Sequence, residues 1–323
     1  MARGWWAAPL AALALGLWPA AAGAGEQVVI GAYVNDIQAL DLRTHSYAVD
    51  VYVWFRWKDE AIDPSQSIEL VNGYELWGHT RTYDYPDAPR VLPSGERYQV
   101  LREQGRFSKK LLLTSYPFDS QVLIVELEEP ALESDAVGFV PDTQPISLNP
   151  RLIIPGFEVG EPRLVIERHQ YPTDFGDHAA GKAHFSRIRI EIPIRRPIVT
   201  YGVKFLLPIL CVVLCAALMF LFSPKYVESR AGIGITSLLT IVALQITLNE
   251  DLPEIDYLVL IDKIYLVAYL FVIGGLAVVV RTSWLIQRGE EARAARIDRL
   301  SLLLLGSGFL LINALLVVPH LLS

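Results

Sequence analysis

Acidic, hydroxylated and apolar residues recur at helical spacing along one segment in the second half of the chain. Glu228 opens the series and Glu250 closes it, and the steps of 4, 4, 3, 4, 3 and 4 residues approximate the 3.6 residues of a helical turn. Carboxylates at both ends, a hydroxyl near one end and an apolar centre suit a path for ions, because charges facing lipid are costly. The face consists of Glu228, Gly232, Thr236, Leu239, Ala243, Ile246 and Glu250.

A single helix cannot enclose a path, so several copies of the chain would have to surround a common axis. Each acidic position then becomes a ring of carboxylates, which attracts cations and repels anions. An apolar ring at Leu239 would exclude water and act as a gate. The alternative is a polar helix buried in a bundle of four helices from the same chain.

The composition indicates a membrane protein. The 323 residues are 52% hydrophobic and 20% charged, with a mean hydropathy of +0.34 and a net charge of −7. This apolar content excludes a disordered chain, and an acidic balance without basic, aromatic-interleaved runs excludes nucleic-acid binding. Cys211 and Cys215 lie in one apolar run, so an exported domain would have to fold without disulfides.

Residues 1–24 predict a secretory signal peptide. Arg3 supplies the positive charge, residues 5–17 are apolar, and the small residues at 22–24 fit the cleavage rule. A retained membrane anchor is the alternative for this segment.

Residues 25–196 predict an extracellular all-β sandwich of the immunoglobulin-like kind. Every second residue from Tyr47 to Trp57 is aromatic or valine, and isoleucines occupy every second position from Ile188 to Ile194. Such alternation places one face of a strand on a core. Turns are expected at residues 63–65, 93–95 and 141–143, and short strands separated by turns are typical of a sandwich.

Residues 197–323 predict a transmembrane domain of four helices. Each apolar run approaches the roughly 20 residues that cross a hydrocarbon core of about 30 Å. Lys225 and Arg230 follow the first run and five arginines follow the third, whereas residues 249–256 contain four acids and no base. The positive-inside rule therefore places the sandwich and the C-terminus outside. The spans are expected at about 198–222, 229–248, 257–281 and 299–322.

An exported sandwich joined to four spans, the second of them polar, resembles the pentameric ligand-gated ion channels. Residues 116–121, Tyr-Pro-Phe-Asp-Ser-Gln, resemble the signature loop of that family. Lys109 and Leu123 stand where the family has its bracketing cysteines, which indicates the prokaryotic branch that lacks the disulfide. The family's Trp-x-Pro segment is not evident near residues 73–77. Further similarities are Trp-x-Asp at 57–59, Arg196, Tyr201, Pro208, Leu252-Pro253 and the short linker at 292–296.

The resemblance implies a homopentamer around a central pore, in a ligand-gated, cation-selective channel with pH modulation as a further expectation. It implies a multi-pass protein of the bacterial inner membrane, surrounded by lipids and with a periplasmic N-terminal domain. Monovalent cations would permeate, and an amine or a proton would be the agonist. Sandwich core is the alternative for about half of the aromatic ligand contacts that it implies. The implied ligand contacts are the aromatic residues Phe55, Trp57, Tyr74, Trp77, Phe139, Tyr171 and Phe175, together with the acidic residue Asp135.

The resemblance also implies a coupling zone where the sandwich meets the membrane. Asp119 and Asp41 should face Arg196, forming a contact that differs between conformers. A static salt bridge is the alternative. His45 lies nearby and could titrate near neutral pH. The motion would pass to Leu252 and Pro253.

The sequence does not predict an enzyme, a cofactor or a metal site. It contains no nucleophile elbow, phosphate-binding glycine loop or His-Glu-x-x-His motif. His178 and His184, near Asp174 and Asp177, permit a zinc site without requiring one. The alternative function is a membrane-anchored periplasmic ligand-binding or sensor protein without conduction, which would not need the acidic-to-apolar series on the second span.

Overall fold

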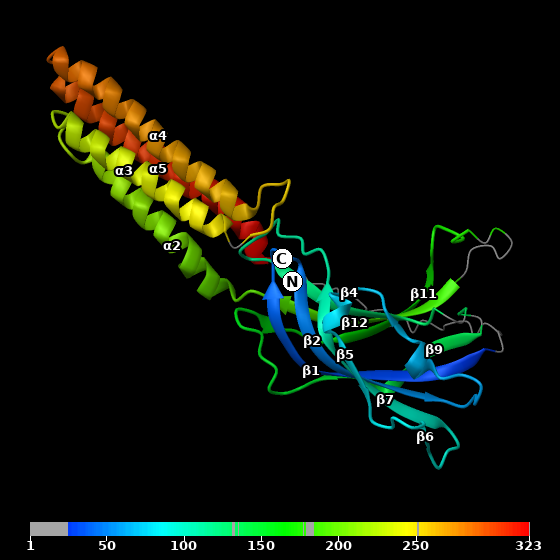
Figure 1. Ribbon diagram of the computed structural model, residues 1–323. Coiled ribbons are helices and arrows are strands. Elements are labelled where there is room, and N and C mark those ends of the chain that lie inside the picture. Colours follow the sequence, from blue (N-terminus) through cyan, green and yellow to red (C-terminus); the bar gives the residue numbers. More distant parts are fainter. Residues whose placement is uncertain are drawn as a thin grey trace, which may run out of the picture.

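The computed structural model describes residues 25–130, 133–134, 136–176, 178, 184–250 and 252–322. In this part of the chain a β-sandwich and a bundle of long helices lie end to end (Figure 1). The predicted signal peptide, the predicted ligand contact Asp135 and the predicted zinc neighbour Asp177 lie outside the described residues.

Two sheets form the sandwich within the described residues. The seven-stranded sheet has the path β4-β7-β2-β1-β9, and β5 and β6 also pair with β7. Its strands are β1 (Glu26–Asp41), β2 (Ser46–Trp57), β4 (Gly73–Tyr74), β5 (Thr80–Tyr83), β6 (Arg90–Val91), β7 (Arg97–Ser108) and β9 (Val137–Leu148). The five-stranded sheet has the path β10-β12-β8-β3, and β11 also pairs with β12. Its strands are β3 (Glu69–Leu70), β8 (Ser120–Glu128), β10 (Glu158–Val159), β11 (Arg163–Gln170) and β12 (His184–Arg195).

The core lies between the two sheets, and the predicted alternation is confirmed. On β2 the apolar residues from Tyr47 to Trp57 are buried at every second position, and the isoleucines of β12 from Ile188 to Ile194 are buried in the same way. Both sets belong to one continuous hydrophobic cluster. Because a strand shows its faces alternately, the intervening polar residues point away from this core.

Two of the predicted turns have a different structure. Residues 141–143 lie inside β9, which pairs in parallel with β1 across a register shift and ends the path of its sheet. A proline is tolerated there because an edge strand leaves one row of backbone groups unpaired. The turn expected at residues 63–65 is instead the start of the short helix α1 (Pro64–Ser67), where the side chain of Asp63 accepts a hydrogen bond from the Ser65 N–H. The turn expected at 93–95 is present, with Gly95 at φ 82°.

Four long helices of the described chain are apolar enough to cross a membrane. The first, α2, is extended by the 3₁₀ turn η2, and the tight turn between the last two contains Gly289 at φ 77°. The last two are longer than the predicted spans, because their polar turns continue the helices beyond the apolar runs. The elements are α2 (Ile198–Ala217), η2 (Leu218–Phe220), α3 (Val227–Asn249), α4 (Leu260–Gln287) and α5 (Glu291–Leu322).

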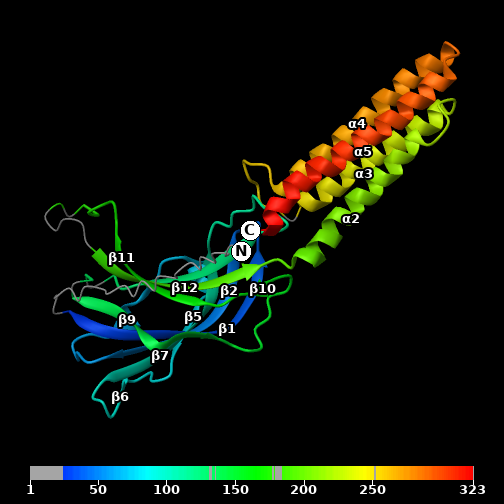
Figure 2. The ribbon, with the colours of Figure 1, turned by 180° about the vertical axis from the view of Figure 1, so that it is seen from behind.

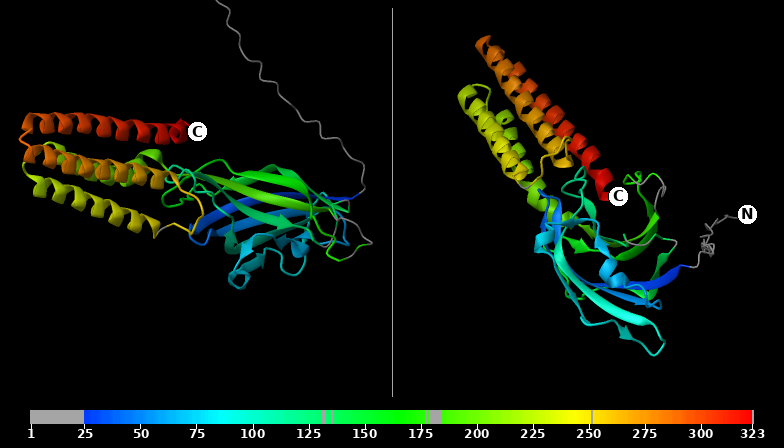
Figure 3. Two further views of the ribbon diagram at one scale, coloured as in Figure 1. Left: turned by 90° about the horizontal axis from the view of Figure 1, so that it is seen from above. Right: turned by 45° about the vertical axis from the view of Figure 1, so that its right-hand side comes forward.

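The helices alternate in direction. The α2–α3 and α4–α5 connections lie at the end of the bundle far from the sandwich, whereas the α3–α4 connection and the end of α5 lie beside it (Figures 1 and 2). Seen from above, α4 lies between α3 and α5 (Figure 3). The arginine-rich connection is therefore at the distal end, in agreement with the predicted orientation of the spans.

Candidate functional site

The predicted ion-path residues lie on the exposed face of α3. All seven are exposed in the single chain, and the apolar members Leu239 and Ile246 are 64% and 57% exposed. Glu228 lies in the first turn of the helix, where the helix dipole favours a negative charge. One chain therefore leaves this face free to line a path or to meet another copy.

The opposite face of α3 packs into the bundle. Its buried residues are Arg230, Gly234, Ser237, Ile241 and Leu248. Gln245 also turns inward: its amide accepts a hydrogen bond from the Tyr269 hydroxyl at 2.6 Å and donates to Asp262 at 3.4 Å, both on α4. The exposed hydroxyls of Thr240 and Thr247 donate to carbonyls one turn earlier.

Arg196 joins the sandwich to the bundle through a buried ion pair. Its Nε lies 2.8 Å from Asp119 Oδ1, and the two side chains are 5% and 2% exposed. The guanidinium also lies 4.5–4.9 Å from the ring centroids of Tyr116, Phe157 and Tyr201, a distance at which ring faces attract a cation. The structure thus contains one of the two predicted contacts of Arg196.

Asp41 has other partners, which corrects the second predicted contact. Its carboxylate accepts hydrogen bonds from the backbone N–H groups of Arg43 at 2.8 Å and Thr44 at 3.4 Å, in its own turn. These bonds lower the pKa of Asp41 although partial burial acts in the opposite direction. A short acidic side chain next to a turn finds backbone donors more easily than a distant guanidinium.

The signature loop caps the first turn of α4, a contact that the sequence reading missed. The carbonyls of Thr114 and Tyr116 accept hydrogen bonds from the N–H groups of Leu260 at 3.0 Å and Ile261 at 3.2 Å. The N–H of Leu113 donates to the hydroxyl of a tyrosine at position 257, also at 3.0 Å. The first N–H groups of any helix lack hydrogen-bond partners within the helix. The expectation that some other segment must accept these bonds is the sequence signal that could have predicted the contact.

His45 lies at the wall of a cavity of about 380 Å³ at this junction. The lining residues are Arg43, His45, Lys110, Leu252, Pro253 and Glu254. The Nδ1 atom of His45 accepts a hydrogen bond from the Leu111 N–H at 3.2 Å. Burial lowers the pKa of His45, the charge of Lys110 lowers it further, and Asp41 acts in the opposite direction. Both Leu252 and Pro253 are buried beside it.

Three of the predicted ligand contacts belong to the sandwich core instead. Phe55, Trp57 and Phe139 are 0%, 1% and 6% exposed and lie in the same hydrophobic cluster. The Trp57 indole donates to the Ile62 carbonyl within the domain. Their rings face inward because they occupy core positions of β2 and β9, so we leave them out of the candidate ligand site.

Tyr171 and Phe175 form an aromatic cluster at the end of β11. The rings of Tyr171 and Phe175 meet edge to face at 5.2 Å, and His169 meets Tyr171 at 4.6 Å. The Tyr171 hydroxyl donates to Glu128 at 2.8 Å and accepts from Arg187 at 3.0 Å. Burial and the neighbouring carboxylate raise the pKa of Tyr171. Phe175 is 71% exposed, so its ring is available to a ligand or another copy.

Tyr74, in β4, and Trp77, in the 3₁₀ turn that follows it, lie on the other sheet in a segment that His79 anchors. Trp77 is 86% exposed, whereas the side chain of His79 is 7% exposed and packs over Gly105. Its Nδ1 lies 2.9 Å from Glu103 Oε1, and its Nε2 lies 2.8 Å from the carbonyl oxygen of Arg106. Both ring nitrogens thus lie within hydrogen-bond distance of an oxygen, and these two contacts fix the orientation of the ring.

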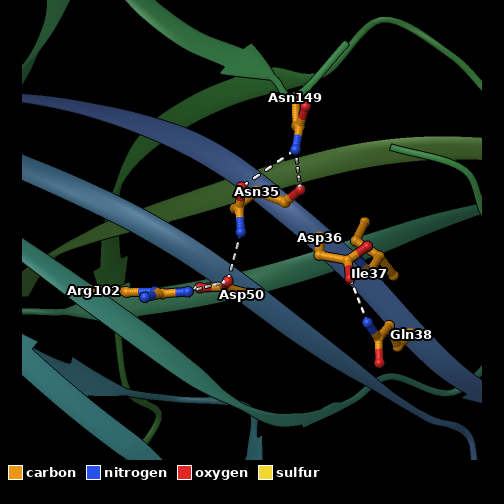
Figure 4. Close-up of polar contacts among 7 residues, drawn as sticks. All are labelled: Asn35, Asp36, Ile37, Gln38, Asp50, Arg102 and Asn149. Atoms are coloured by element: carbon orange, nitrogen blue, oxygen red, sulfur yellow. Dashed lines mark hydrogen bonds and ion pairs between the residues drawn. The ribbon is translucent and has the colours of Figure 1, made fainter. Parts of the chain in front are cut away.

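A polar network on the outward face of the seven-stranded sheet was also missed (Figure 4). Asp50 accepts two hydrogen bonds from Arg102, at 2.9 and 2.8 Å, and one from Asn35 at 2.7 Å. Asn149 donates to Asn35 from the segment after β9. The bonds from Arg102 are the main cause that lowers the pKa of Asp50. This network ties β1, β2 and β7 together on the side away from the core.

Comparison with known proteins identifies the family. No protein-family model matches the chain. The proton-gated ion channel of Gloeobacter violaceus is 25% identical over 300 residues, which cover 88% of this chain and 81% of that channel. The glycine receptor subunit beta of Rattus norvegicus is 21% identical over 298 residues, or 84% of this chain and 58% of the receptor subunit. The glutamate-gated chloride channel of Drosophila melanogaster is 21% identical over 268 residues, or 77% of this chain and 57% of that channel.

This chain belongs to the pentameric ligand-gated ion channel superfamily. Its mostly-β domain followed by four apolar helices is the fold of that superfamily. It is therefore a multi-pass membrane protein with an extracellular N-terminal domain. The chain spans little more than half the length of the matched animal subunits. Because these relatives include a chloride channel, membership of the superfamily does not determine which ions pass.

Proposed function

We propose that five copies of this chain form a cation-selective, ligand-gated channel whose pore is lined by α3. The observation that carries the proposal is the exposed face of α3, with Glu228 at one end, Leu239 in the middle and Glu250 at the other end. The relatives named as proton-, glutamate- and glycine-related channels and receptors support gated ion conduction. Cation selectivity rests on the two carboxylates.

Glu228 is the main charge filter in this proposal. Five carboxylates around a narrow mouth would create a negative field that mobile salt screens poorly. Like charges at short range oppose one another's ionisation, but partial ionisation still leaves a negative ring. Glu250 would face the wider extracellular mouth, where its field is screened and mainly concentrates cations.

The agonist would bind where sandwich domains of adjacent copies meet. Phe175 and Trp77 are exposed aromatic residues at two different places on the domain, as a site between two copies requires. Ring faces attract an amine, by about 0.5–2 kcal/mol for a good contact. A proton is the other candidate agonist, supported by His45 at the junction cavity and by the relative named as proton-gated. The membrane would be the bacterial inner membrane, with the sandwich in the periplasm.

The arrangement would transmit motion through the junction. The Arg196–Asp119 pair and the signature loop connect β12 and β8 to α2 and α4. A displacement of the sandwich would then move the α3–α4 connection at Leu252 and Pro253, and with it the outer end of α3. Gating requires such a connection to have two arrangements.

Reversal potentials in a salt gradient test this function. We expect purified, reconstituted wild-type protein to reverse near the cation potential and E228A to shift clearly toward the chloride potential. E250A should shift much less. The matched control is E290Q, at the same end of the bundle but on the α4–α5 turn, where the carboxylate pairs with Arg293 at 2.9 Å.

The outcomes separate the possibilities. A wild type that reverses at the chloride potential contradicts cation selectivity, and an unchanged E228A moves the filter elsewhere. A protein that forms pentamers in native mass measurements but conducts no ions with any agonist or pH would favour the sensor function.

A further inference from the structure

Arg230 is a buried cation at the cytoplasmic end of the pore-facing helix. Its residue exposure is 0%, although it is only two positions after Glu228. Two helical positions correspond to about 200° around the axis, so the two side chains point to nearly opposite sides of α3. The guanidinium of Arg230 therefore lies inside the bundle, whereas the carboxylate of Glu228 is exposed.

The guanidinium binds one partner from each of the other three helical segments. Its Nε donates to the Met219 carbonyl of η2 at 2.6 Å, and its Nη1 donates to the Thr282 hydroxyl of α4 at 3.1 Å. Its Nη2 lies 2.5 Å from Asp298 Oδ1 on α5. The arginine thus fixes the rotation of the inner end of α3 relative to its three neighbours.

Asp298 supplies the negative charge that makes this position tolerable. Its residue exposure is 2%, and its side chain is 3% exposed. A buried charge without its partner is strongly unfavourable, so the guanidinium would leave the bundle if the carboxylate were neutral. Glu228 is exposed only two positions away, so a released guanidinium would lie near the mouth that Glu228 lines in the proposed pentamer.

We propose that Asp298 determines the charge selectivity of the channel indirectly, by retaining the Arg230 guanidinium inside the bundle. Five retained guanidinium groups leave the ring at Glu228 negative, whereas five released groups would neutralise it. Asp298 is therefore a positioning residue on α5, remote from the ion path itself. This inference rests on the proposed cation-channel function.

The test compares cation-to-chloride permeability ratios from reversal potentials. D298N should lower the ratio on the order of tenfold, because a unit positive charge then lies within several ångströms of each carboxylate. The double variant D298N/R230Q, which removes both charges, should return the ratio to within about twofold of wild type. A role in packing alone predicts no such recovery, because the double variant disrupts the contact as well.

An exposed ion pair at the same end provides the control. Lys225 and Glu291 are 2.8 Å apart, with side chains 56% and 58% exposed, so E291Q should leave the ratio unchanged. If D298N prevents assembly, T282V replaces it: this variant removes one partner of the guanidinium and keeps both charges, and it should lower the ratio by about twofold.

Three results would overturn the inference. These are an unchanged ratio in assembled D298N, an equal loss in D298N and D298N/R230Q, or an unchanged ratio in T282V where D298N does not assemble. A wild type that is not cation-selective would instead contradict the proposed function, so the two failures are distinguishable.

Discussion

Arg196 and Asp119 form a buried ion pair at the residue where the last strand of the sandwich leads into the first membrane helix. The Nε–Oδ1 distance is 2.8 Å, and Asp119 is held from its other oxygen by the amide of Gln121 at 2.8 Å. Three aromatic rings surround the guanidinium. The contact thus joins the two domains through an ion pair that is almost completely shielded from solvent.

The first prediction concerns this pair. R196A should leave pentamers assembled but reduce the maximal agonist-evoked current severely, because Asp119 loses its positive partner. Removing one partner of a buried pair costs about 3–5 kcal/mol, so thermal stability in detergent should fall as well. Agonist-evoked current and melting temperature are the measurements.

R195A is the control for this variant. Arg195 forms an exposed pair with Glu158 at 2.7 Å, with side chains 71% and 51% exposed. Exposed pairs contribute about 0–1 kcal/mol, so its gating should match wild type. An R196A channel that gates normally would show that the pair in the wild type is a static salt bridge without a role in gating.

The second prediction concerns the gate. L239S should raise agonist sensitivity or produce a leak current, because a hydroxyl in the apolar ring admits water. Leu304 on α5 is 72% exposed, and L304S should not change the current although it makes the same chemical change on a lipid-facing helix. Dose–response curves of L239S that overlay those of wild type at equal surface expression would refute a gate at this residue.

The third prediction concerns pH. Since the pKa of His45 is lowered, the neutral imidazole stabilises this conformation above the ordinary histidine value, and that contribution is lost as the pH falls through the lowered value. Protonation of Nδ1 also abolishes the hydrogen bond from Leu111. Acidification should therefore shift the channel away from this conformation. The positive side chains of Lys110 and Arg43 would repel a protonated His45, whereas the carboxylates of Asp41 and Glu254 would attract it.

Current measured against pH for wild type and H45N tests this expectation. An asparagine retains an oxygen acceptor but does not titrate, so the pH response below the ordinary histidine value of about 6.5 should flatten. H178N is the control, because His178 is 86% exposed on the sandwich and pairs with Asp174. A pH response that H45N shares with wild type would assign proton sensing to other groups.

The fourth prediction concerns the ligand site. F175A should raise the half-maximal concentration of an activating amine about tenfold, within the range of a lost cation–ring contact. Stability should change by less than about 0.5 kcal/mol, since the ring is 71% exposed. The matched control I153A removes a side chain that is 76% exposed, and it should not affect activation. An F175A channel with wild-type sensitivity would exclude this ring from the site.

Local periodicity determined most of the fold. The alternation from Tyr47 to Trp57 reflects the period of two of a strand, and it is sufficient to assign the buried face of β2 without any partner. The apolar runs identify α2 to α5 because a helix that crosses lipid must be apolar over its own length. The exposed face of α3 follows from helical spacing in the same way.

Contacts between distant segments were decided by the tertiary structure. Asp41 and Asp119 have the same charge and both lie near the junction, yet one binds its own turn and the other binds Arg196. Phe55 is an aromatic residue like Phe175, but its strand position turns its ring into the core. Residue type cannot separate such cases, because both members of each pair carry the same chemistry.

The partner of Arg230 illustrates the reason most clearly. Helical spacing indicates that this arginine points away from Glu228, but not what it meets there. Asp298 lies 68 positions later in the chain, on another helix. Side-chain periodicity describes one element at a time, whereas the energy of a buried charge depends on which other element supplies its counter-charge. That pairing exists once the helices have packed, and the folded chain alone determines it.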